Sequence, residues 1–183
     1  MDTGIELGYD QIGEIWISAP SAMLGYYKNQ KETGDILITD ENGTRWVKTG
    51  DLGRINRVGL LFHEGRIRRI YLTTFEGQPA KIFPGLIESA VKKLPDVFDC
   101  TAVARFRAGS ACYEPVACVI PHPGHKPLGT LAKELQHICT KSLPTYMQPV
   151  EYRFVAEFPH TPIGKVDYRA LERMIEEIGN DYE

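Results

Sequence analysis

The sequence predicts an α+β protein: a β-rich N-terminal subdomain, then a small α+β domain with a short sheet and about three amphipathic helices. Before residue 84, short alternating apolar segments are separated by turn residues, and no stretch of useful length has helical periodicity. After residue 84, amphipathic helix patterns alternate with strand patterns. This alternation favours helices packed on one side of a small sheet.

The expected strands of the first part are 13–18, 36–39, 46–48, 54–56 and 60–63. The first of these alternates polar and apolar side chains, as a half-buried strand does. Asp40-Glu41-Asn42-Gly43 is a hairpin-type turn after the second strand. The third strand leads into Thr49-Gly50-Asp51, so we expect Asp51 at a junction between strand and turn.

Three later segments have the spacing of an amphipathic helix. Their apolar stripes are Ile87-Ala90-Val91-Leu94, Leu131-Leu135-Ile138 and Leu171-Ile175-Ile178. Pro84 and Pro95 bound the first helix, and Thr130 and Asp167 are the expected N-caps of the other two. The expected strands between the helices are 100–107, 115–121 and 152–156.

Composition and charge exclude several classes of protein. The chain has 183 residues, enough for one domain with a core or for one small domain plus part of another. Its net charge of −3 offers no general basic field for nucleic acid. No apolar run approaches the roughly 20 residues of a membrane-spanning helix, and the first residues lack the pattern of a secretory signal.

The four cysteines, Cys100, Cys112, Cys118 and Cys139, are too sparse for a disulfide scaffold. They lie among Val, Ile and Ala, where a reduced thiol behaves as a small apolar group. A cytoplasmic location is the simplest interpretation. Cys118, His122 and His125 lack a fourth ligand, so no metal site is predicted.

Two polar clusters follow the N-terminal strands. Asp51 stands between Gly50 and Gly53, and an unobstructed carboxylate accepts paired hydroxyl donors such as those of a ribose. A turn-capping Asp is the alternative. Gly65-Arg66-Ile67-Arg68-Arg69 offers three guanidinium groups for phosphate or hydroxyl oxygens, or is a strand edge protected by charge.

The third cluster is Pro159-His160-Thr161-Pro162-Ile163-Gly164-Lys165-Val166-Asp167-Tyr168. Its prolines stiffen the loop, and Gly164 removes bulk directly before Lys165. A helix is expected to begin immediately afterwards. The loop therefore presents one ammonium group near a helix N-terminus, although an ordinary exposed lysine is the alternative.

The order and spacing of these clusters are more specific than any one of them. The ordered set is Gly13–Ile17, Gly25–Tyr27, Lys48–Gly53, Gly65–Ile70, Ile82–Glu88, Leu143–Pro149 and Pro159–Tyr168. It resembles the last core motifs of the adenylate-forming superfamily, which includes acyl-CoA synthetases, adenylation domains of nonribosomal peptide synthetases, D-alanine–carrier ligases and luciferases. The resemblance extends from Gly13 to about Leu171.

This resemblance implies specific roles for five residues. Asp51 is similar to the ribose-binding Asp, and Arg66 to the Arg that meets the nucleotide near its ribose. Lys165 is similar to the lysine that enters the site for adenylation only. Arg68 takes the place of the hinge residue, where relatives usually carry Asp or Lys. Gly77 takes the place of the glycine near the pantetheine channel, after an expected longer loop over 71–76.

The resemblance also implies domains, cofactors and partners. Residues 1–64 are expected to be the tail of a large N-terminal nucleotide-binding domain, 65–70 a hinge, and 71–183 a mobile C-terminal domain. The family's phosphate loop and acyl pocket lie upstream, so the missing N-terminal domain is the expected partner. The expected ligands are ATP or AMP with Mg²⁺, a carboxylic acid, and coenzyme A or the pantetheine of a carrier protein.

The leading hypothesis is therefore the C-terminal part of an acyl-CoA ligase that is inactive without the large domain. One alternative is an amino-acid-activating domain that charges a carrier protein. Another is a stand-alone, non-catalytic binding module. Nucleic-acid binding is not expected, because the arginines near the hinge lack a regular aromatic stacking platform.

Overall fold

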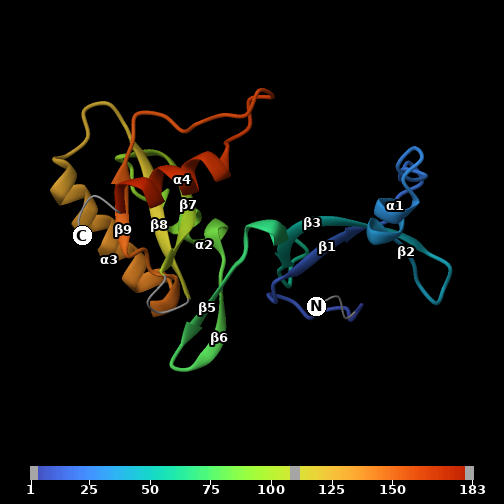
Figure 1. Cartoon of the computed structure of the whole chain (residues 1–183). Helices are drawn as coiled ribbons and strands as arrows, with labels where there is room; N and C mark the ends of the chain where they lie inside the picture. Colours follow the sequence, from blue (N-terminus) through green and yellow to red (C-terminus); the bar gives the residue numbers. More distant parts are fainter. Residues whose placement is uncertain (1–3, 108–111, 180–183) are drawn as a thin grey trace. The chain divides into compact units, whose positions relative to one another are not determined.

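The computed structural model describes residues 4–107 and 112–179, with side chains up to residue 176. The chain divides into two compact units, Met1–Arg68 (unit 1) and Arg69–Glu183 (unit 2). Figure 1 follows the elements along the chain. The predicted α+β class is confirmed, with a β-rich first unit and a second unit that combines helices with small sheets.

Unit 1 contains a sheet built around one long strand. β3 (Arg45–Ile55) pairs with β1 (Gly13–Ile17) along one edge and with β2 (Leu37–Thr39) and β4 (Leu61–Arg66) along the other, always antiparallel. Figure 1 shows β3 running beside β1 in this sheet. The predicted strands are confirmed, but two of them, 46–48 and 54–56, are parts of the single strand β3.

The turn between β2 and β3 is held by the Asp40 carboxylate. Its Oδ1 accepts hydrogen bonds from the backbone N–H groups of Asn42 at 2.9 Å and Thr44 at 2.8 Å. Its Oδ2 accepts one from the indole N–H of Trp46 at 2.9 Å. The Trp46 and Thr44 donors lower the pKa of Asp40, because each favours the ionised carboxylate. The predicted hairpin turn is thus confirmed.

One helix in unit 1 was not expected. The prediction that no helix precedes residue 84 is wrong, because α1 spans Gln30–Ile36. This short helix buries none of its residues, so it has no apolar stripe from which periodicity could reveal it. Its local signal is Asn29, whose side chain accepts a hydrogen bond from the Glu32 N–H at 3.2 Å.

Unit 2 is centred on a three-stranded mixed sheet. β7 (Val97–Arg107) and β8 (Cys112–Pro121) are antiparallel, and β9 (Glu151–Phe154) runs parallel to β8. The helices are α2 (Pro84–Val91), α3 (Leu128–Ser142) and α4 (Tyr168–Gly179). The three predicted helices are confirmed, although Ile178 of the third stripe lies outside the described side chains.

The helices do not lie on one side of this sheet, so that expectation is wrong. Alternate strand residues point to opposite faces. One core cluster combines α2 and α3 with Cys100 and Ala102 of β7. The other combines Leu171 and Ile175 of α4 with Val103, the next residue of β7. Both faces of β7 and β8 carry apolar side chains. Helices cover each face, because exposed apolar surface would be unfavourable in water.

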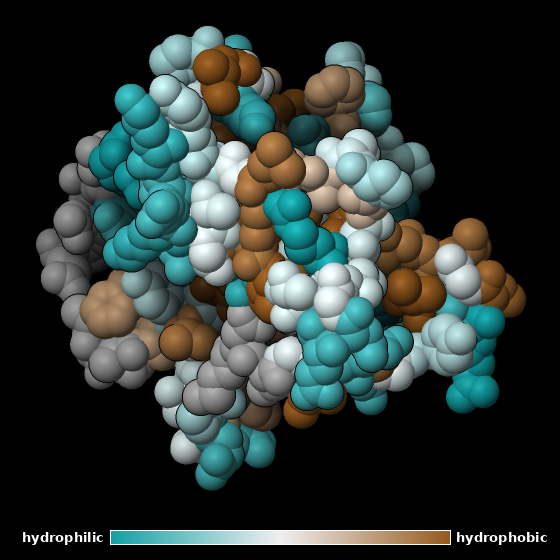
Figure 2. Space-filling model, turned by 90° about the vertical axis from the view of Figure 1, so that its right-hand side faces the viewer, coloured by the Kyte–Doolittle hydropathy of each residue, from teal (hydrophilic) through white to brown (hydrophobic). Residues whose placement is uncertain are grey.

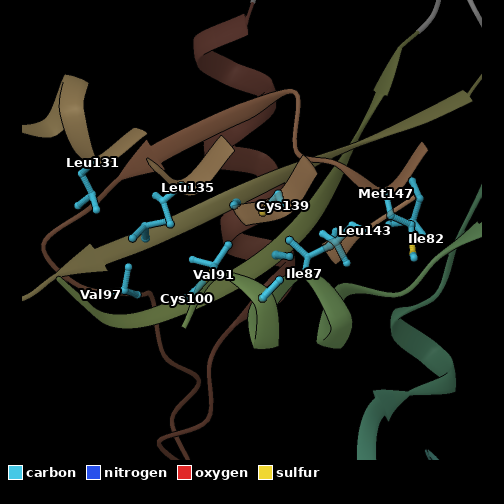
Figure 3. Close-up of a cluster of buried hydrophobic side chains, with 14 residues drawn as sticks. Ile82, Ile87, Val91, Val97, Cys100, Leu131, Leu135, Cys139, Leu143 and Met147 are labelled. Atoms are coloured by element: carbon cyan, nitrogen blue, oxygen red, sulfur yellow. The ribbon is translucent and has the colours of Figure 1, made fainter. Parts of the chain in front are cut away.

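The larger cluster forms the main core of unit 2. Figure 3 shows Leu131, Leu135 and Cys139 of α3 in one cluster with Ile87 and Val91 of α2. All five side chains are fully buried. Burying each of the larger ones contributes about 1.5–3 kcal/mol relative to exposure. Unit 2 therefore has a core of its own.

The two expected helix caps have different outcomes. Asp167 caps α4, since its Oδ1 accepts a hydrogen bond from the Ala170 N–H at 3.0 Å, and that prediction is confirmed. Thr130 does not cap α3, because the helix begins earlier. Pro127 precedes the first turn, and its carbonyl accepts the N–H groups of Thr130 and Leu131 at 2.8 and 3.0 Å. Pro at this entry has no polar side chain to mark it as a cap.

Along the chain, a hairpin follows the boundary between the two units. β5 (Tyr71–Phe75) and β6 (Gln78–Ile82) pair in register, so the expectation of a loop over 71–76 is wrong. Glu76 and Gly77 have φ values of 50° and 75°, which is the two-residue turn that continues the twist of a hairpin. Two 3₁₀ turns, Ile67–Arg69 and Thr145–Met147, complete the fold.

The described helices include none with the length and apolar character that crossing a membrane requires.

Cys100, Cys118 and Cys139 are buried. Burial raises the pKa of Cys118 to about 11 and raises the pKa of Cys100 as well. These thiols are therefore neutral, small apolar groups of the core, as predicted from their neighbours in the sequence.

Candidate functional site

Asp51 and Arg66 meet across adjacent strands in unit 1. Asp51 lies in β3 directly opposite Arg66 of β4, and Arg66 Nε is 2.8 Å from Asp51 Oδ1. Asp51 is inside a strand, so its predicted position at a junction between strand and turn is wrong. Gly50, the residue before Asp51, interrupts the regular strand geometry. Its φ of 69° favours a residue without Cβ.

The backbone around Asp51 is held by side chains from both strands. Thr49 Oγ1 donates to the Ile15 carbonyl at 2.8 Å and accepts from the Asp51 N–H at 3.0 Å. Glu14 Oε1 accepts from the Gly50 N–H at 3.0 Å. Thr49 and Gly50 are thus linked to β1, and the Asp51 carboxylate projects from a fixed base.

The Asp51 carboxylate has unused hydrogen-bonding capacity. Its Oδ1 is buried and has no hydrogen-bond donor among the described residues. Arg66 Nε touches this oxygen, but not along a hydrogen-bonding direction, and His63 Nε2 lies 3.8 Å away. The carboxyl side chain is still 25% exposed, so a ligand carrying hydroxyl groups can reach it.

The three arginines near the unit boundary are not equivalent. The Arg66 side chain is 62% exposed, and Arg68 is exposed in the 3₁₀ turn that ends unit 1. Arg69 is buried instead: it forms an ion pair with Glu88, and its Nη2 donates to the Ala102 carbonyl at 2.9 Å. The prediction that all three guanidinium groups face a ligand is wrong for Arg69.

Lys165 lies on a tight loop of unit 2. His160 and Val166 form an isolated antiparallel bridge at the base of this loop. Within it, the Thr161 N–H donates to the Lys165 carbonyl at 2.7 Å, and the Gly164 N–H donates to the Thr161 carbonyl at 2.8 Å. Gly164 has a φ of 76°, which favours glycine and completes the turn. The loop therefore has a defined backbone rather than an extended one.

The Lys165 side chain is exposed, and no ion pair within the described part of the chain involves its ammonium group. The backbone next to it is fixed, since the Asp167 N–H donates to the Pro159 carbonyl at 2.8 Å and Asp167 caps α4. A single available cation on a fixed backbone can be delivered to an anion with little loss of conformational entropy.

The other predicted residue of unit 2, Gly77, lies at the exposed turn between β5 and β6. The structure thus brings Asp51 and Arg66 into contact in unit 1, and it places Gly77 and Lys165 on two separate loops of unit 2. Among the described residues, no group of three or more His, Cys, Asp or Glu side chains is arranged to hold a metal ion.

Sequence reasoning missed two residues of the Asp51 cluster, His63 and Glu14. His63 pairs with Gly53, and a bulge between Leu52 and Gly53 changes the register so that His63 approaches Asp51. A bulge of this kind depends on pairing between strands, so local sequence does not reveal it. Glu14 belongs to a strand that was predicted, but its partner Gly50 lies 36 residues away.

Comparison with known proteins identifies the family. Residues 86–165, which include Lys165, match the family described as the AMP-binding enzyme C-terminal domain. The chain therefore contains an AMP-binding enzyme C-terminal domain. The resemblance inferred from the ordered motifs is thereby confirmed.

Relatives and solved structures agree with this assignment to the adenylate-forming enzymes. Acyl-CoA synthetase 7 of Caenorhabditis elegans is 31% identical over 172 residues, which cover 94% of this chain and 30% of the relative. The amide bond synthetase McbA from Marinactinospora thermotolerans has a TM-score of 0.80 and 25% identity, covering 95% of this chain and 33% of that one. The anthranilate CoA ligase AuaEII, solved with anthranoyl-AMP, has a TM-score of 0.75 and 25% identity, covering 96% and 32%.

The chain therefore spans between 30% and 33% of the length of these three proteins. The similarity extends over both units, because each comparison covers at least 94% of the chain.

Proposed function

We propose that this chain acts with a large N-terminal domain as an ATP-dependent acyl-CoA ligase. In the first step, a carboxylate oxygen of the acid attacks the α-phosphorus of ATP, which gives acyl-AMP and releases pyrophosphate. In the second step, the thiol sulfur of coenzyme A attacks the acyl carbonyl and AMP leaves. Residues 1–64 belong to the large domain, 65–70 form the hinge around Arg68, and 71–183 form the mobile domain.

The observation that carries this proposal is the exposed Lys165 ammonium on a loop whose backbone is fixed. During adenylation, negative charge accumulates where the carboxylate meets the α-phosphate. An ammonium group held there in a site without water stabilises this charge. Removing a comparable hydrogen-bond donor from an active site lowers the rate by about 10²–10³. Two opposite unit charges about 4 Å apart, at an effective dielectric of about 20, attract by about 4 kcal/mol.

Asp51 and Arg66 are proposed to hold the nucleotide in unit 1. The two ribose hydroxyls donate to the Asp51 carboxylate, whose side chain is 25% exposed. Arg66, largely exposed beside it, contacts the nucleotide near the ribose. ATP brings Mg²⁺ bound to its phosphates, where the ion neutralises charge. No residue of this chain is assigned to that ion.

The proposed N-terminal domain also accounts for the surface of unit 1. Many large apolar side chains of unit 1 are exposed, among them Leu24 at 89%, Val58 at 78% and Ile5 at 70%. Figure 2 shows such hydrophobic residues, in brown, at the surface between hydrophilic ones. A soluble surface rarely exposes so much apolar area unless another body covers it.

The proposal is tested by separating the two half-reactions. We expect Lys165→Ala, in the enzyme that contains the large domain, to lower pyrophosphate exchange with ATP and Mg²⁺ by about 10²–10³. Conversion of a supplied acyl-adenylate to the thioester should remain. Lys133→Ala is the matched control, because Lys133 is also an exposed lysine of unit 2. Equal loss in both half-reactions of Lys165→Ala would contradict the role of Lys165.

Two further measurements separate the alternatives. The 183-residue chain alone should show no pyrophosphate exchange, since it lacks a glycine-rich phosphate loop. Measurable exchange by this chain would refute its dependence on the large domain.

The acceptor is identified by offering coenzyme A and a pantetheinylated carrier protein in competition. Preference for the carrier would make the enzyme an amino-acid-activating or related carrier-charging protein.

A further inference from the structure

Arg69, the first residue of unit 2, has a buried side chain that none of the proposed roles uses. The side chain is 15% exposed, and its Nη2 donates to Glu88 Oε1 at 2.5 Å and to the Ala102 carbonyl at 2.9 Å. Its Nε is buried and has no acceptor among the described residues. A buried donor without a partner costs free energy, so a role beyond filling space is expected.

Glu88 holds the Arg69 guanidinium in one orientation. The same Oε1 that pairs with Arg69 also accepts the Ala102 N–H at 2.9 Å. Glu88 belongs to α2 and Ala102 to β7, so the guanidinium is bound between two elements of the unit 2 core. The residue that follows the unit boundary is therefore attached to the rigid part of unit 2.

The guanidinium also stacks on the helix that follows the Lys165 loop. Arg69 Cζ lies 3.9 Å from the ring centroid of Tyr168, which is the first residue of α4 and the third after Lys165. One turn further along α4, Glu172 Oε1 accepts a hydrogen bond from the Tyr71 hydroxyl. Two residues at the start of unit 2 thus contact one face of α4.

We propose that Arg69 is a positioning residue that ties the C-terminal end of the hinge to the base of the Lys165 loop. Because Arg69 binds Glu88, Ala102 and Tyr168 together, a rotation at Arg68 carries the Lys165 loop with it as one body. A planar guanidinium can stack on a ring and donate along its edges simultaneously, whereas an ammonium group cannot. That this rotation serves adenylation rests on the proposed function. That Arg69 holds the Lys165 loop to the rest of unit 2 does not.

The structural part is tested by amide hydrogen exchange in the 183-residue chain. The reporters are the hydrogen-bonded N–H groups of Thr161, Gly164, Lys165 and Asp167. We expect Arg69→Lys to speed their exchange about tenfold, and Tyr168→Leu to do the same, because each removes the stack. Tyr168→Phe keeps the ring and should exchange as the unchanged chain does.

The matched control is Arg153→Lys. Arg153 is 17% exposed, forms an ion pair with Glu151, and donates to the Met174 carbonyl of α4, away from the Lys165 loop. This variant removes a largely buried guanidinium of β9 that contacts the same helix, so general loosening of α4 would appear in it too. Faster loop exchange in Arg69→Lys but not in Arg153→Lys supports the proposal. Equal exchange in both variants overturns it.

The functional part is tested in the enzyme that contains the large domain. Arg69→Lys should lower kcat for adenylation about tenfold, leave KM for ATP unchanged, and leave thioester formation from supplied acyl-adenylate unchanged. Equal loss of both half-reactions would mean that Arg69 only supports folding. If Lys165→Ala has no effect on adenylation, the proposed function fails. The role of Arg69 in holding the loop is still decided by the hydrogen-exchange experiment.

Discussion

Unit 1 and unit 2 are built in different ways. Of the buried hydrophobic side chains among the described residues, Leu52 alone belongs to unit 1, whereas all others lie in unit 2. Unit 1 is held mainly by strand pairing and by polar side chains such as Glu14, Asp40 and Thr49. Unit 2 combines helices and strands around two apolar clusters.

This difference shows which unit can act as an independent body. Burial of apolar surface is the dominant favourable contribution to folding, and unit 2 contains nearly all of it. A domain that rotates between two half-reactions needs a core of its own, because it exchanges one set of surroundings for another. Unit 1, with an exposed apolar surface, is suited to be a fixed part of a larger domain.

The largest expected effect tests the core of unit 2. Leu135→Ala should destabilise unit 2 by about 2–5 kcal/mol, because Leu135 is fully buried in the larger cluster. Both tryptophans, Trp16 and Trp46, lie in unit 1, so tryptophan fluorescence reports that unit, while far-UV circular dichroism reports the helices of unit 2. The denaturant midpoint should fall in the dichroism signal and stay unchanged in fluorescence.

A parallel shift of both signals in Leu135→Ala would mean that the two units unfold as one. Leu24→Ala is the control for this measurement. Leu24 is 89% exposed, so its truncation should change stability by less than about 0.5 kcal/mol.

A smaller effect is expected from the buried ion pair of unit 1. Arg54 Nε lies 2.8 Å from Glu64 Oε1, and the Glu64 side chain is only 8% exposed. Arg54→Met should cost about 1–3 kcal/mol, because it leaves a buried carboxylate without its partner. The fluorescence midpoint should report this loss. The double variant Arg54→Met with Glu64→Leu should recover most of it, and no recovery would place the effect in packing against Phe62.

The smallest effect is a pH dependence at Asp40. The pKa of Asp40 is below its ordinary value of 3.8 in the folded chain, because Trp46 and Thr44 donate to the carboxylate. Its stabilisation is therefore fully present above the unfolded value and is lost as pH falls through the folded value. Asp40→Asn should lower the fluorescence midpoint at about pH 6, and this difference should shrink toward about pH 3. A difference that grows on acidification would reverse the assigned direction.

The prediction from sequence succeeded where local pattern is sufficient. The three helices of unit 2 were predicted because their apolar residues recur with the helical period, and most of those that the structure describes are buried. Asp167 was predicted as a cap because an N-cap is a local interaction. The family was recognised because the order of motifs around Asp51, Arg66 and Lys165 is a property of the chain itself.

The failures share one physical cause, which is dependence on contacts between distant segments. Asp51 is inside a strand because β4 pairs with it, and His63 joins its cluster through a bulge in that pairing. Residues 71–75 form a strand because β6 pairs with them. Arg69 looks like its exposed neighbours in the sequence, but Glu88 and Ala102, 19 and 33 residues away, bind it in the interior.

The order of residues along the chain was sufficient for the class of fold, the helices of unit 2 and the family, because periodicity, capping and motif order are written in neighbouring positions. Folding in three dimensions was needed to establish which face of the sheet α4 covers, which arginine is buried and what surrounds Asp51. These features depend on strand register and on burial, and both arise only when segments far apart in the sequence pack together.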